Sequence, residues 1–224
     1  MSQQVSDIAN EFTDRLRKMT VTPEKAAEIE KHQSEECVRR ERIQIAVLRE
    51  KWNAPKRHSA FKPPQDGPWG VERSKLRDML EPSTGRILAL VGGRGNGKTQ
   101  LAVELMKLRT EALKSALFSS AVEFFIKIKS TYRKDSDTDE MEVLREFQKP
   151  SLLVIDEIGK RGGSEWENTM LFELLNRRYN DMTDTILIDN RTKAEFQETI
   201  GPSLASRMNE GGGIIECTWG SFRV

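Results

Sequence analysis

The sequence predicts an α/β fold in which a parallel sheet is covered by helices on both faces. Apolar runs short enough to be buried strands alternate with helical segments over most of the chain. One of these runs, "RILALV", leads straight into a glycine-rich loop and then a helix. Another, "LLVIDE", ends in two adjacent acidic residues. Together these observations predict a sheet that presents loops and acidic side chains at one edge.

Length and composition limit the number of domains and the kinds of site that the chain can contain. With 224 residues, the chain can form one α/β domain and an appendage. Its net charge of +1 means that any nucleic-acid site must be a local patch. Two cysteines and two histidines form no ligand set, which argues against structural zinc and for a reduced compartment. No run approaches the ~20 apolar residues of a membrane span, and the polar N-terminus is no secretion signal, so we expect a cytoplasmic protein.

The first 52 residues are expected to form a helical N-terminal region. Apolar residues three and four apart predict one helix: Val5, Ile8, Phe12, Leu16 and Met19. Thr22, Pro23 and Glu24 then give a helix start, and this second helix could extend to Trp52. It is either a solvated hairpin packed on the core or a partner-binding arm. We favour the arm, because little core is available here for so much helix.

Residues 53–69 contain four prolines and no helical period, which predicts a linker or extended strap before a domain at 70–224. Within that domain the pattern alternates regularly. Helices are expected at 72–80, 101–113, 122–132 and 165–179, with one or two more within 193–208. Strands are expected at 85–93, 116–119, 151–159, 185–189 and 213–219. This order predicts a five-stranded parallel sheet flanked by helices.

The loop "GGRGNGKT" fits the pattern G-x-x-x-x-G-K-[ST], with a strand before it and a helix after it. Glycines let the backbone curl so that several N–H groups point at phosphate oxygens, and the helix N-terminus adds positive charge. Lys98 would reach the outer phosphates, and the Thr99 hydroxyl would bind Mg²⁺. The predicted nucleotide-binding residues are Gly92, Gly93, Arg94, Gly95, Asn96, Gly97, Lys98, Thr99 and Gln100.

Asp156 and Glu157 lie at the end of the apolar strand in "LLVIDEIG" and complete the predicted site. Asp156 would hold Mg²⁺, and Glu157 would polarise the attacking water. The guanine-specific N-K-x-D sequence is absent, which favours ATP over GTP. Asn190 closes the next strand and could contact the γ-phosphate or the water, although asparagine is also an ordinary strand-end residue. From spacing alone, Arg207 and Arg223 are surface cations.

A basic cluster between the second and third strands is a candidate site for single-stranded DNA. It comprises Lys127, Lys129, Arg133 and Lys134, close to Phe125 and Tyr132. Cations can follow phosphates while rings stack on bases. The alternative is a half-buried helix with Phe124, Phe125 and Ile128 in the core. A second basic run, at 39–62, is mixed with acids and is interpreted as an interface.

Seven motifs in a fixed order resemble the DnaC-type helicase loaders and the related IstB transposition ATPases of the AAA+ class. They are "GGRGNGKT", "LLVIDEIG", "SEW", "NRRY", "DNRT", "IGPSLASRM" and "WGSFR", and the resemblance covers roughly residues 70–223. "DRLRKM" and "RRERIQ…NAPKRHSAF" look more like the DnaC side. The resemblance implies an AAA+ phosphate-loop core, here with no C-terminal lid and without the N-terminal zinc module of many loaders.

The resemblance also assigns roles. Lys98 and Thr99 match the Walker A pair, and Asp156 and Glu157 the Walker B pair. Asn190 matches sensor 1, Arg207 the arginine finger and Arg223 the sensor 2 arginine. It implies an ATPase that loads a hexameric, DnaB-type replicative helicase onto single-stranded DNA, with ATPase domains side by side on the helicase. Two alternatives remain: a transposition ATPase that regulates a transposase and its target DNA, and a slow ATP-dependent switch.

Overall fold

The computed structural model describes residues 23–60, 66–81, 83–133 and 135–222. The helix expected over residues 5–19 lies outside these ranges, as do Lys134 and Arg223. The chain divides into two units, one ending at Gln44 and one beginning at Ile45. The second unit therefore begins well before the expected domain start at residue 70. Two tryptophans explain the difference, since Trp52 and Trp69 are both buried in its core.

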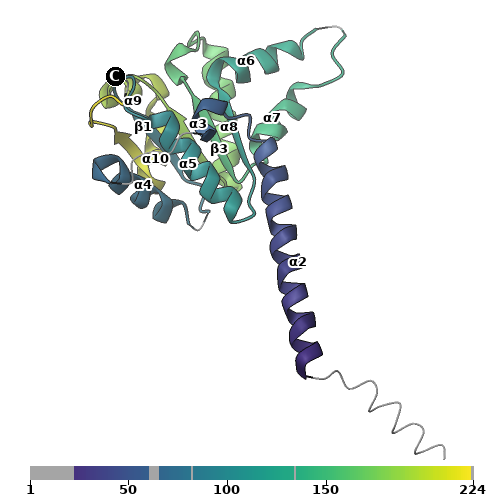
Figure 1. Cartoon of the computed structure of the whole chain (residues 1–224). Coiled ribbons are helices and arrows are strands. Elements are labelled where there is room, and N and C mark those ends of the chain that lie inside the picture. Colours follow the sequence, from purple (N-terminus) through teal and green to yellow (C-terminus); the bar gives the residue numbers. More distant parts are fainter. Residues whose placement is uncertain (1–22, 61–65, 82, 134, 223–224) are drawn as a thin grey trace, which may run out of the picture. The chain divides into compact units, whose positions relative to one another are not determined.

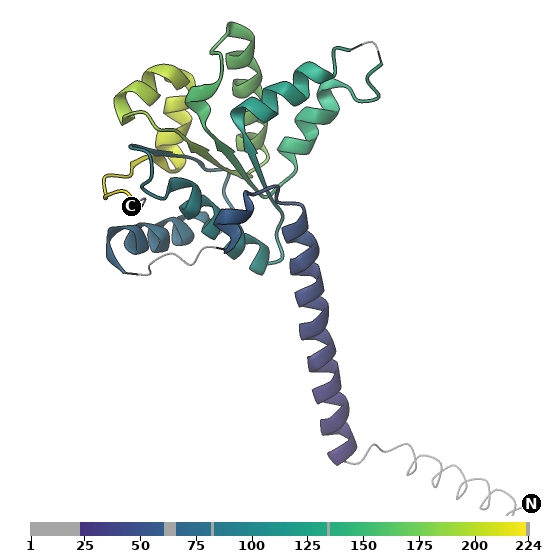
Figure 2. The ribbon, with the colours of Figure 1, turned by 45° about the horizontal axis from the view of Figure 1, so that its top comes forward.

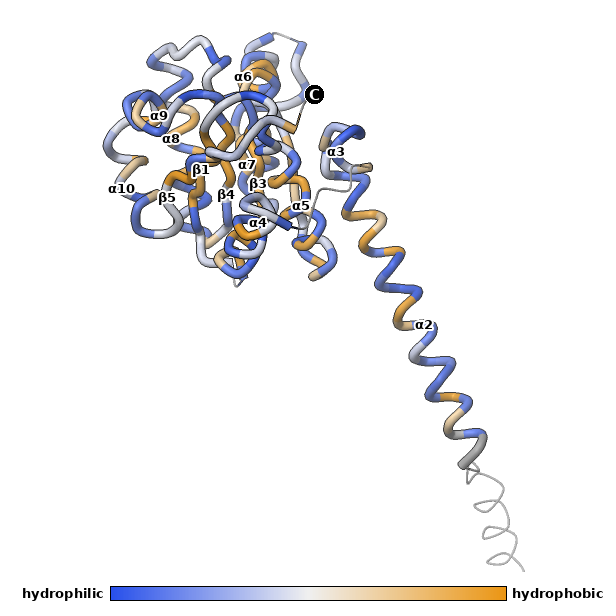
Figure 3. The backbone as a smooth tube through the Cα atoms, turned by 60° about the vertical axis from the view of Figure 1, so that its left-hand side comes forward, coloured by the Kyte–Doolittle hydropathy of each residue, from blue (hydrophilic) through white to orange (hydrophobic). Residues whose placement is uncertain are grey.

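Helix α2 runs from Pro23 to Glu50, close to the predicted second helix (Figure 1). Hydrophilic and hydrophobic residues alternate along it, whereas apolar residues concentrate on the strands of the sheet (Figure 3). Ile29, Val38, Ile43 and Val47 are apolar side chains on α2 that remain 44–56% exposed. Among the described residues, no helix is both long enough and apolar enough to cross a membrane.

The second unit contains a five-stranded sheet in the order β2-β3-β4-β1-β5, with every neighbouring pair parallel. The strands are β1 (Ile87–Val91), β2 (Ala116–Ser120), β3 (Leu152–Asp156), β4 (Asp184–Ile188) and β5 (Gly213–Glu216). The predicted parallel sheet of five strands is thereby confirmed. Parallel pairing brings all five carboxyl ends to one edge, which is where α/β folds of this kind bind ligands.

Alternate residues of β1 show how the two faces are covered. Ile87, Ala89 and Val91 belong to the core cluster under one set of helices, and Leu88 and Leu90 to the cluster under the other. Figure 2 shows the two helical layers on either side of the sheet. The first set comprises α6 (Ala121–Ser130), α7 (Glu140–Gln148), α8 (Glu165–Asn180), α9 (Lys193–Ile200) and α10 (Pro202–Gly211). The second comprises α4 (Gly67–Leu80) and α5 (Lys98–Glu111).

Helices α3 and α7 were not predicted, and the short 3-10 helix Ile158–Lys160 replaces the end of the strand expected at 151–159. Helix α3 (Lys56–Ala60) lies within the segment interpreted as a linker, and α4 begins in the same segment at Gly67. The sequence does contain a signal that could have predicted helix α7. Asp139 and Glu142 form a capping box before an apolar pattern that buries Val143 and Phe147. In the 193–208 region the chain forms two helices, because Gly201 (φ 81°) and Pro202 end α9 and begin α10.

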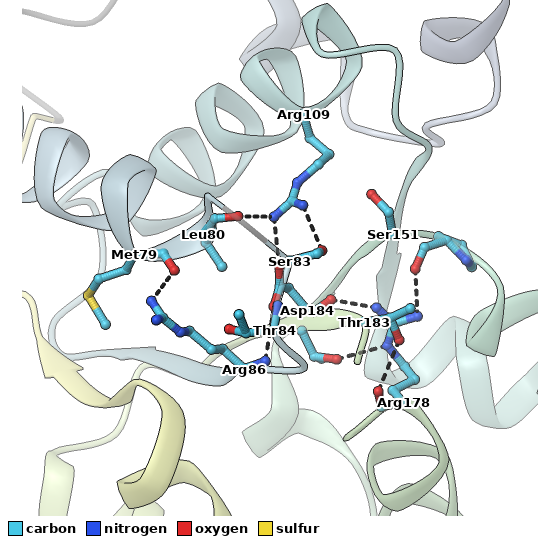
Figure 4. Close-up of polar contacts among 12 residues, drawn as sticks. Met79, Leu80, Ser83, Thr84, Arg86, Arg109, Ser151, Arg178, Thr183 and Asp184 are labelled. Carbon is cyan, nitrogen blue, oxygen red and sulfur yellow. Dashed lines mark hydrogen bonds and ion pairs between the residues drawn. The ribbon is translucent and has the colours of Figure 1, made fainter. Parts of the chain in front are cut away.

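Buried arginines secure the amino ends of the strands, opposite the edge described above (Figure 4). The Asp184 carboxylate begins β4 and is fully buried. It accepts a hydrogen bond from Arg109 Nη2 at 2.7 Å and another from the Arg86 amide at 2.9 Å. Arg109 also donates to the Leu80 carbonyl and to the Ser83 hydroxyl, both at 2.8 Å. These bonds connect α5 to β4 and to the segment before β1.

Arg178, on α8, also donates hydrogen bonds at the amino ends of the strands. Its Nη1 donates to the carbonyls of Phe147, Gln148 and Pro150 at 2.8–3.0 Å, and its Nε donates to the Thr185 hydroxyl at 2.8 Å. Burial lowers the pKa of Arg178 to about 9, so the guanidinium stays charged at neutral pH. One side chain thus satisfies carbonyls in the turn before β3, which would otherwise be buried without donors.

Replacing Arg178 with methionine should destabilise the fold by about 3 kcal/mol, because several buried carbonyls lose their donor while apolar volume is kept. Chemical denaturation measures the change. The matched control is Arg177→Met: this neighbour is partly exposed and pairs with Glu173 on the helix surface. Its loss should cost about 0.5 kcal/mol or less. Equal effects of the two substitutions would contradict the proposed importance of the buried arginine.

Candidate functional site

The loop between β1 and α5 curls tightly because its glycines adopt conformations that other residues avoid. Gly92, Gly95 and Gly97 have φ angles of 120°, 85° and 80°. Gly97 is also the N-cap of α5, and a Cβ there would lie 3.0–3.1 Å from the Phe222 ring and the Trp69 indole nitrogen. The loop therefore leads directly into a helix N-terminus. Such a terminus, with its free N–H groups, favours an anion.

Lys98 is buried at the centre of this loop. Its Nζ donates to the carbonyls of Gly92 and Gly93 at 2.8 and 2.7 Å, and to Asn96 Oδ1 at 3.0 Å. Phosphate oxygens would compete with these acceptors for the ammonium protons. The positive charge is thus held inside the curl of the loop, as the motif predicts.

Thr99 and Asp156 connect the loop to the end of β3. The Thr99 hydroxyl donates to one carboxylate oxygen of Asp156 at 2.7 Å, and the Glu157 amide donates to the other at 2.7 Å. Burial raises the pKa of the Asp156 carboxyl above its usual value, although both hydrogen bonds oppose the rise. A partly desolvated carboxylate beside a hydroxyl suits a divalent cation, which would offset the cost of burying the negative charge.

These two residues fit magnesium better than a metal held by protein alone. Within the described ranges, no group of three or more histidine, cysteine, aspartate or glutamate side chains could hold a metal ion. Mg²⁺ commonly takes one or two carboxylates and completes its shell with phosphate oxygens and water. Thr99 and Asp156 would thus hold the ion together with a phosphate ligand.

Glu157 follows Asp156 in a left-handed conformation, with φ 59° and ψ 42°. Non-glycine residues seldom adopt this region, and it is often found at functional sites. The side chain forms an ion pair with Lys160. Glu157, Lys160 and Asn190 all line one cavity with the loop residues. Glu157 and Asn190, which were predicted to act on the same ligand, therefore line the same cavity.

This cavity has a volume of about 520 Å³. Of the predicted site residues it is lined by Arg94, Gly95, Asn96, Gly97, Lys98, Thr99, Gln100, Asp156, Glu157 and Asn190. The sequence reasoning missed Arg57, His58, Trp69, Lys160, Ile188 and Phe222, which line it as well. His58 belongs to α3 and is connected to Gln100 in both directions: Gln100 Nε2 donates to the His58 carbonyl, and the ring Nδ1 lies 3.1 Å from Gln100 Oε1.

The segment after β5 braces the loop from another direction. Asn96 Nδ2 donates to the Cys217 carbonyl at 2.6 Å, and the Trp219 indole donates to the Asn96 carbonyl. The Phe222 amide donates to the Gly95 carbonyl at 2.9 Å. Burial raises the pKa of Cys217 to about 12, so this residue remains a neutral thiol. The last strand therefore helps to fix the shape of the phosphate loop.

The remaining predicted residues lie elsewhere. Arg207 is on α10 and is not among the residues that line the cavity. Lys127 and Lys129 are on α6, where each lies near an acid: Lys127 Nζ is 2.6 Å from Glu146, and Lys129 Nζ is 3.5 Å from Glu167. Phe124, Phe125 and Ile128 on the same helix are buried, which is the arrangement expected for a half-buried helix. Arg133 is exposed.

Sequence comparison relates this chain to two kinds of protein. It is 29% identical over 153 residues to the replicative helicase loader DnaC of Escherichia coli strain K12, which covers 67% of this chain and 62% of DnaC. It is also 29% identical over 140 residues to the insertion sequence IS21 putative ATP-binding protein of Pseudomonas aeruginosa, covering 59% and 49% of the two chains. This chain therefore matches less than two thirds of either relative's length.

Comparison with solved structures supports the same fold for this chain and for DnaC. The crystal structure of the DnaC helicase loader matches with a TM-score of 0.59 and 20% identity, over 75% of this chain and 98% of that chain. At this identity the likeness extends to the fold alone. A comparison with protein families aligns residues 78–209, more than half of the chain, with the IstB-like ATP binding proteins. That span contains the phosphate loop, the acidic end of β3 and Arg207, and the chain belongs to the family of IstB-like ATP binding proteins.

Proposed function

We propose that this chain is a Mg²⁺-dependent ATPase. The observation that carries the proposal is the direct hydrogen bond from Thr99 to Asp156, which places a hydroxyl and a partly desolvated carboxylate at the mouth of the phosphate loop. Lys98 and the loop amides would hold the β- and γ-phosphates. Thr99 and Asp156 would hold Mg²⁺, which when bound polarises the terminal phosphate.

Glu157 acts on the water in this proposal. Its carboxylate accepts a proton as the water oxygen bonds to the γ-phosphorus and the bond to the bridging oxygen breaks, which yields ADP and phosphate. Asn190 lines the same cavity and orients the water or the γ-phosphate. Arg207 would stabilise the charge on phosphates bound by a neighbouring copy, because it does not line the cavity of its own chain. Arg223 would contact the nucleotide of its own chain.

Glu157→Gln should bind ATP with nearly unchanged affinity and hydrolyse it ~10²–10⁴ times more slowly, since an amide cannot accept the proton. Binding is measured by titration with a fluorescent ATP analogue, and turnover by phosphate release. Lys98→Ala serves as the contrasting variant, because loss of the loop cation should remove binding itself. Unchanged turnover in Glu157→Gln would exclude this carboxylate from the chemistry.

We further propose that the chain loads a hexameric replicative helicase onto single-stranded DNA. Similarity to DnaC supports this role, and so does the apolar surface of α2. At about 3.6 residues per turn, Ile43 and Val47 share one side of that helix, where they are 56% and 46% exposed. Apolar side chains in such a position suit a helix that docks into a groove of a partner.

Ile43→Glu combined with Val47→Glu should weaken binding of a DnaB-type helicase by at least tenfold, because two charges enter the apolar contact. ATP affinity should not change. The control, Ala27→Glu with Ser34→Glu, adds the same two charges to the opposite side of α2, where both residues are exposed. A pull-down with the hexameric helicase compares the three proteins. Equal retention of helicase by all of them would reject α2 as the contact surface.

The single-stranded DNA contact is proposed for the exposed side of α6 and the residues after it. Lys127, Lys129, Arg133 and Lys134 supply the charges, and Tyr132 is 58% exposed beside them. In the described part of this region, Glu146 lies close to Lys127 and Glu167 lies close to Lys129. DNA phosphates would have to displace these acids to bind the two lysines. Affinity for DNA should therefore depend on the acids as well as on the cations.

Lys127→Gln with Arg133→Gln should weaken binding of single-stranded DNA and reduce the slope of log affinity against log salt by about 0.7 for each lost phosphate contact. Glu146→Gln is the matched opposite change: it releases Lys127 and should strengthen binding. Fluorescence anisotropy with a labelled oligonucleotide at several salt concentrations measures both. Identical slopes in both variants and in the wild-type protein would favour the purely structural role of α6.

A second function is favoured by the family match and by the IS21 relative: regulation of a transposase and of its choice of target DNA. It requires the same ATP site but a different partner for α2. Repeating the pull-down with an IS21-type transposase separates the two. Retention of transposase and not helicase would replace the loading proposal and leave the ATPase proposal intact.

A further inference from the structure

Two aromatic rings on α8 form a shelf beneath Arg207. Phe172 and Tyr179 are seven residues apart and so lie on the same side of the helix. The guanidinium carbon of Arg207, on α10, lies 5.2 Å from the centroid of the Phe172 ring and 5.8 Å from that of Tyr179. Both distances are within the range of cation–π attraction. We call Phe172 and Tyr179 the aromatic shelf.

The shelf is fixed in place from both helices. Phe172 and Tyr179 are partly buried and pack against the core of the second unit. The Tyr179 hydroxyl donates to Glu210 at 2.7 Å, and Glu210 lies one turn after Arg207 on α10. This bond raises the pKa of Tyr179, so the hydroxyl remains protonated and able to donate at neutral pH. Neither ring can move far without disturbing the contact between α8 and α10.

The two ring contacts constrain the guanidinium of Arg207 while leaving donors for a ligand. The group carries five N–H donors in its plane. One of these, on Nη1, reaches the Ser203 hydroxyl at 3.0 Å. The shelf thus limits the rotamers of a long side chain without consuming the edge that would bind a phosphate. An arginine held in this way loses less conformational freedom when it meets its ligand.

We propose that Phe172 and Tyr179 are positioning residues that orient Arg207 toward the phosphates of a nucleotide bound by a neighbouring copy of this chain. The inference rests on the proposed function of Arg207 and adds residues to which no role has been given. Neither ring touches the nucleotide. The shelf acts through Arg207, so its loss should affect the rate in the neighbouring site and not the binding of ATP in its own.

The test uses full-length chains with saturating ATP, Mg²⁺ and single-stranded DNA. Phe172→Leu with Tyr179→Leu keeps apolar packing but removes both rings. This variant should lower kcat by about tenfold and leave KM for ATP unchanged. Phe172→Tyr retains both rings and the Tyr179–Glu210 bond and should keep near-normal kcat. Thermal unfolding of each variant checks that the fold is kept. Loss of activity in Phe172→Tyr as well would assign the effect to packing and overturn the shelf.

Mixing separates an effect in trans from a local defect. The leucine double variant has an intact nucleotide site, and Lys98→Ala has an intact shelf and Arg207. Adding Lys98→Ala chains should therefore restore turnover in the double variant's sites. No restoration would overturn the proposal. Combining the leucine changes with Arg207→Ala should lower kcat no further than Arg207→Ala alone, and an additive loss would also contradict it.

Failure of the shelf and failure of the Arg207 role give different results. If Arg207→Ala reduces turnover but the leucine double variant does not, only the shelf is overturned. If Arg207→Ala has normal turnover, or if wild-type turnover per chain does not rise with chain concentration, the trans-acting role of Arg207 is itself rejected. The shelf is then rejected with it. The effect of Arg207→Ala thus serves as the reference for the aromatic variants.

Discussion

Parallel pairing of β3 with β4, and of β4 with β1, is the constraint on which the candidate site depends. The register sets Leu90 opposite Ile188 and Ile155 opposite Leu187, so that three strands end at nearly the same level. The phosphate loop follows β1 directly, Asp156 is the last residue of β3, and Asn190 comes two residues after β4. A shift in the β3–β4 register would move Asp156 away from Thr99, which it meets at 2.7 Å. The register of the sheet therefore determines whether the groups of the candidate site meet.

The two edges of the sheet distribute polar groups differently. At the amino ends, Arg109 donates to the buried Asp184 carboxylate, and Arg178 donates to three carbonyls before β3. At the carboxyl ends, unfavourable features accumulate: the Asp156 carboxylate is partly desolvated, and Glu157 has a positive φ. One oxygen of buried Asp189 has no hydrogen-bond partner among the described residues. Strain and unmet polar groups of this kind collect where a protein binds or reacts, and the buried hydrogen bonds at the opposite edge offset them.

The sequence was sufficient for features that depend on local pattern. All five strands, the phosphate loop and the Asp156–Glu157 pair follow from apolar runs and a motif of fixed spacing. It was insufficient where distant segments meet. Arg57 and His58 line the cavity because α3 packs beside Gln100, and Phe222 does so because its amide bonds to Gly95. No local period records such contacts. Prolines around α3 suggested a linker, although Pro55 directly precedes the helix.

Arg207 shows why the spacing of a residue is a poor guide to its surroundings. From the sequence it is one surface cation among many, and 36 lysines and arginines nearly balance 35 acids. The structure distinguishes it: two rings of another helix lie within cation–π range of its guanidinium, and it does not line the cavity of its own chain. In the role proposed above, this cation would meet the phosphates of another copy. On this argument, ATP turnover would depend on assembly, and a partner that gathers several copies would control the rate.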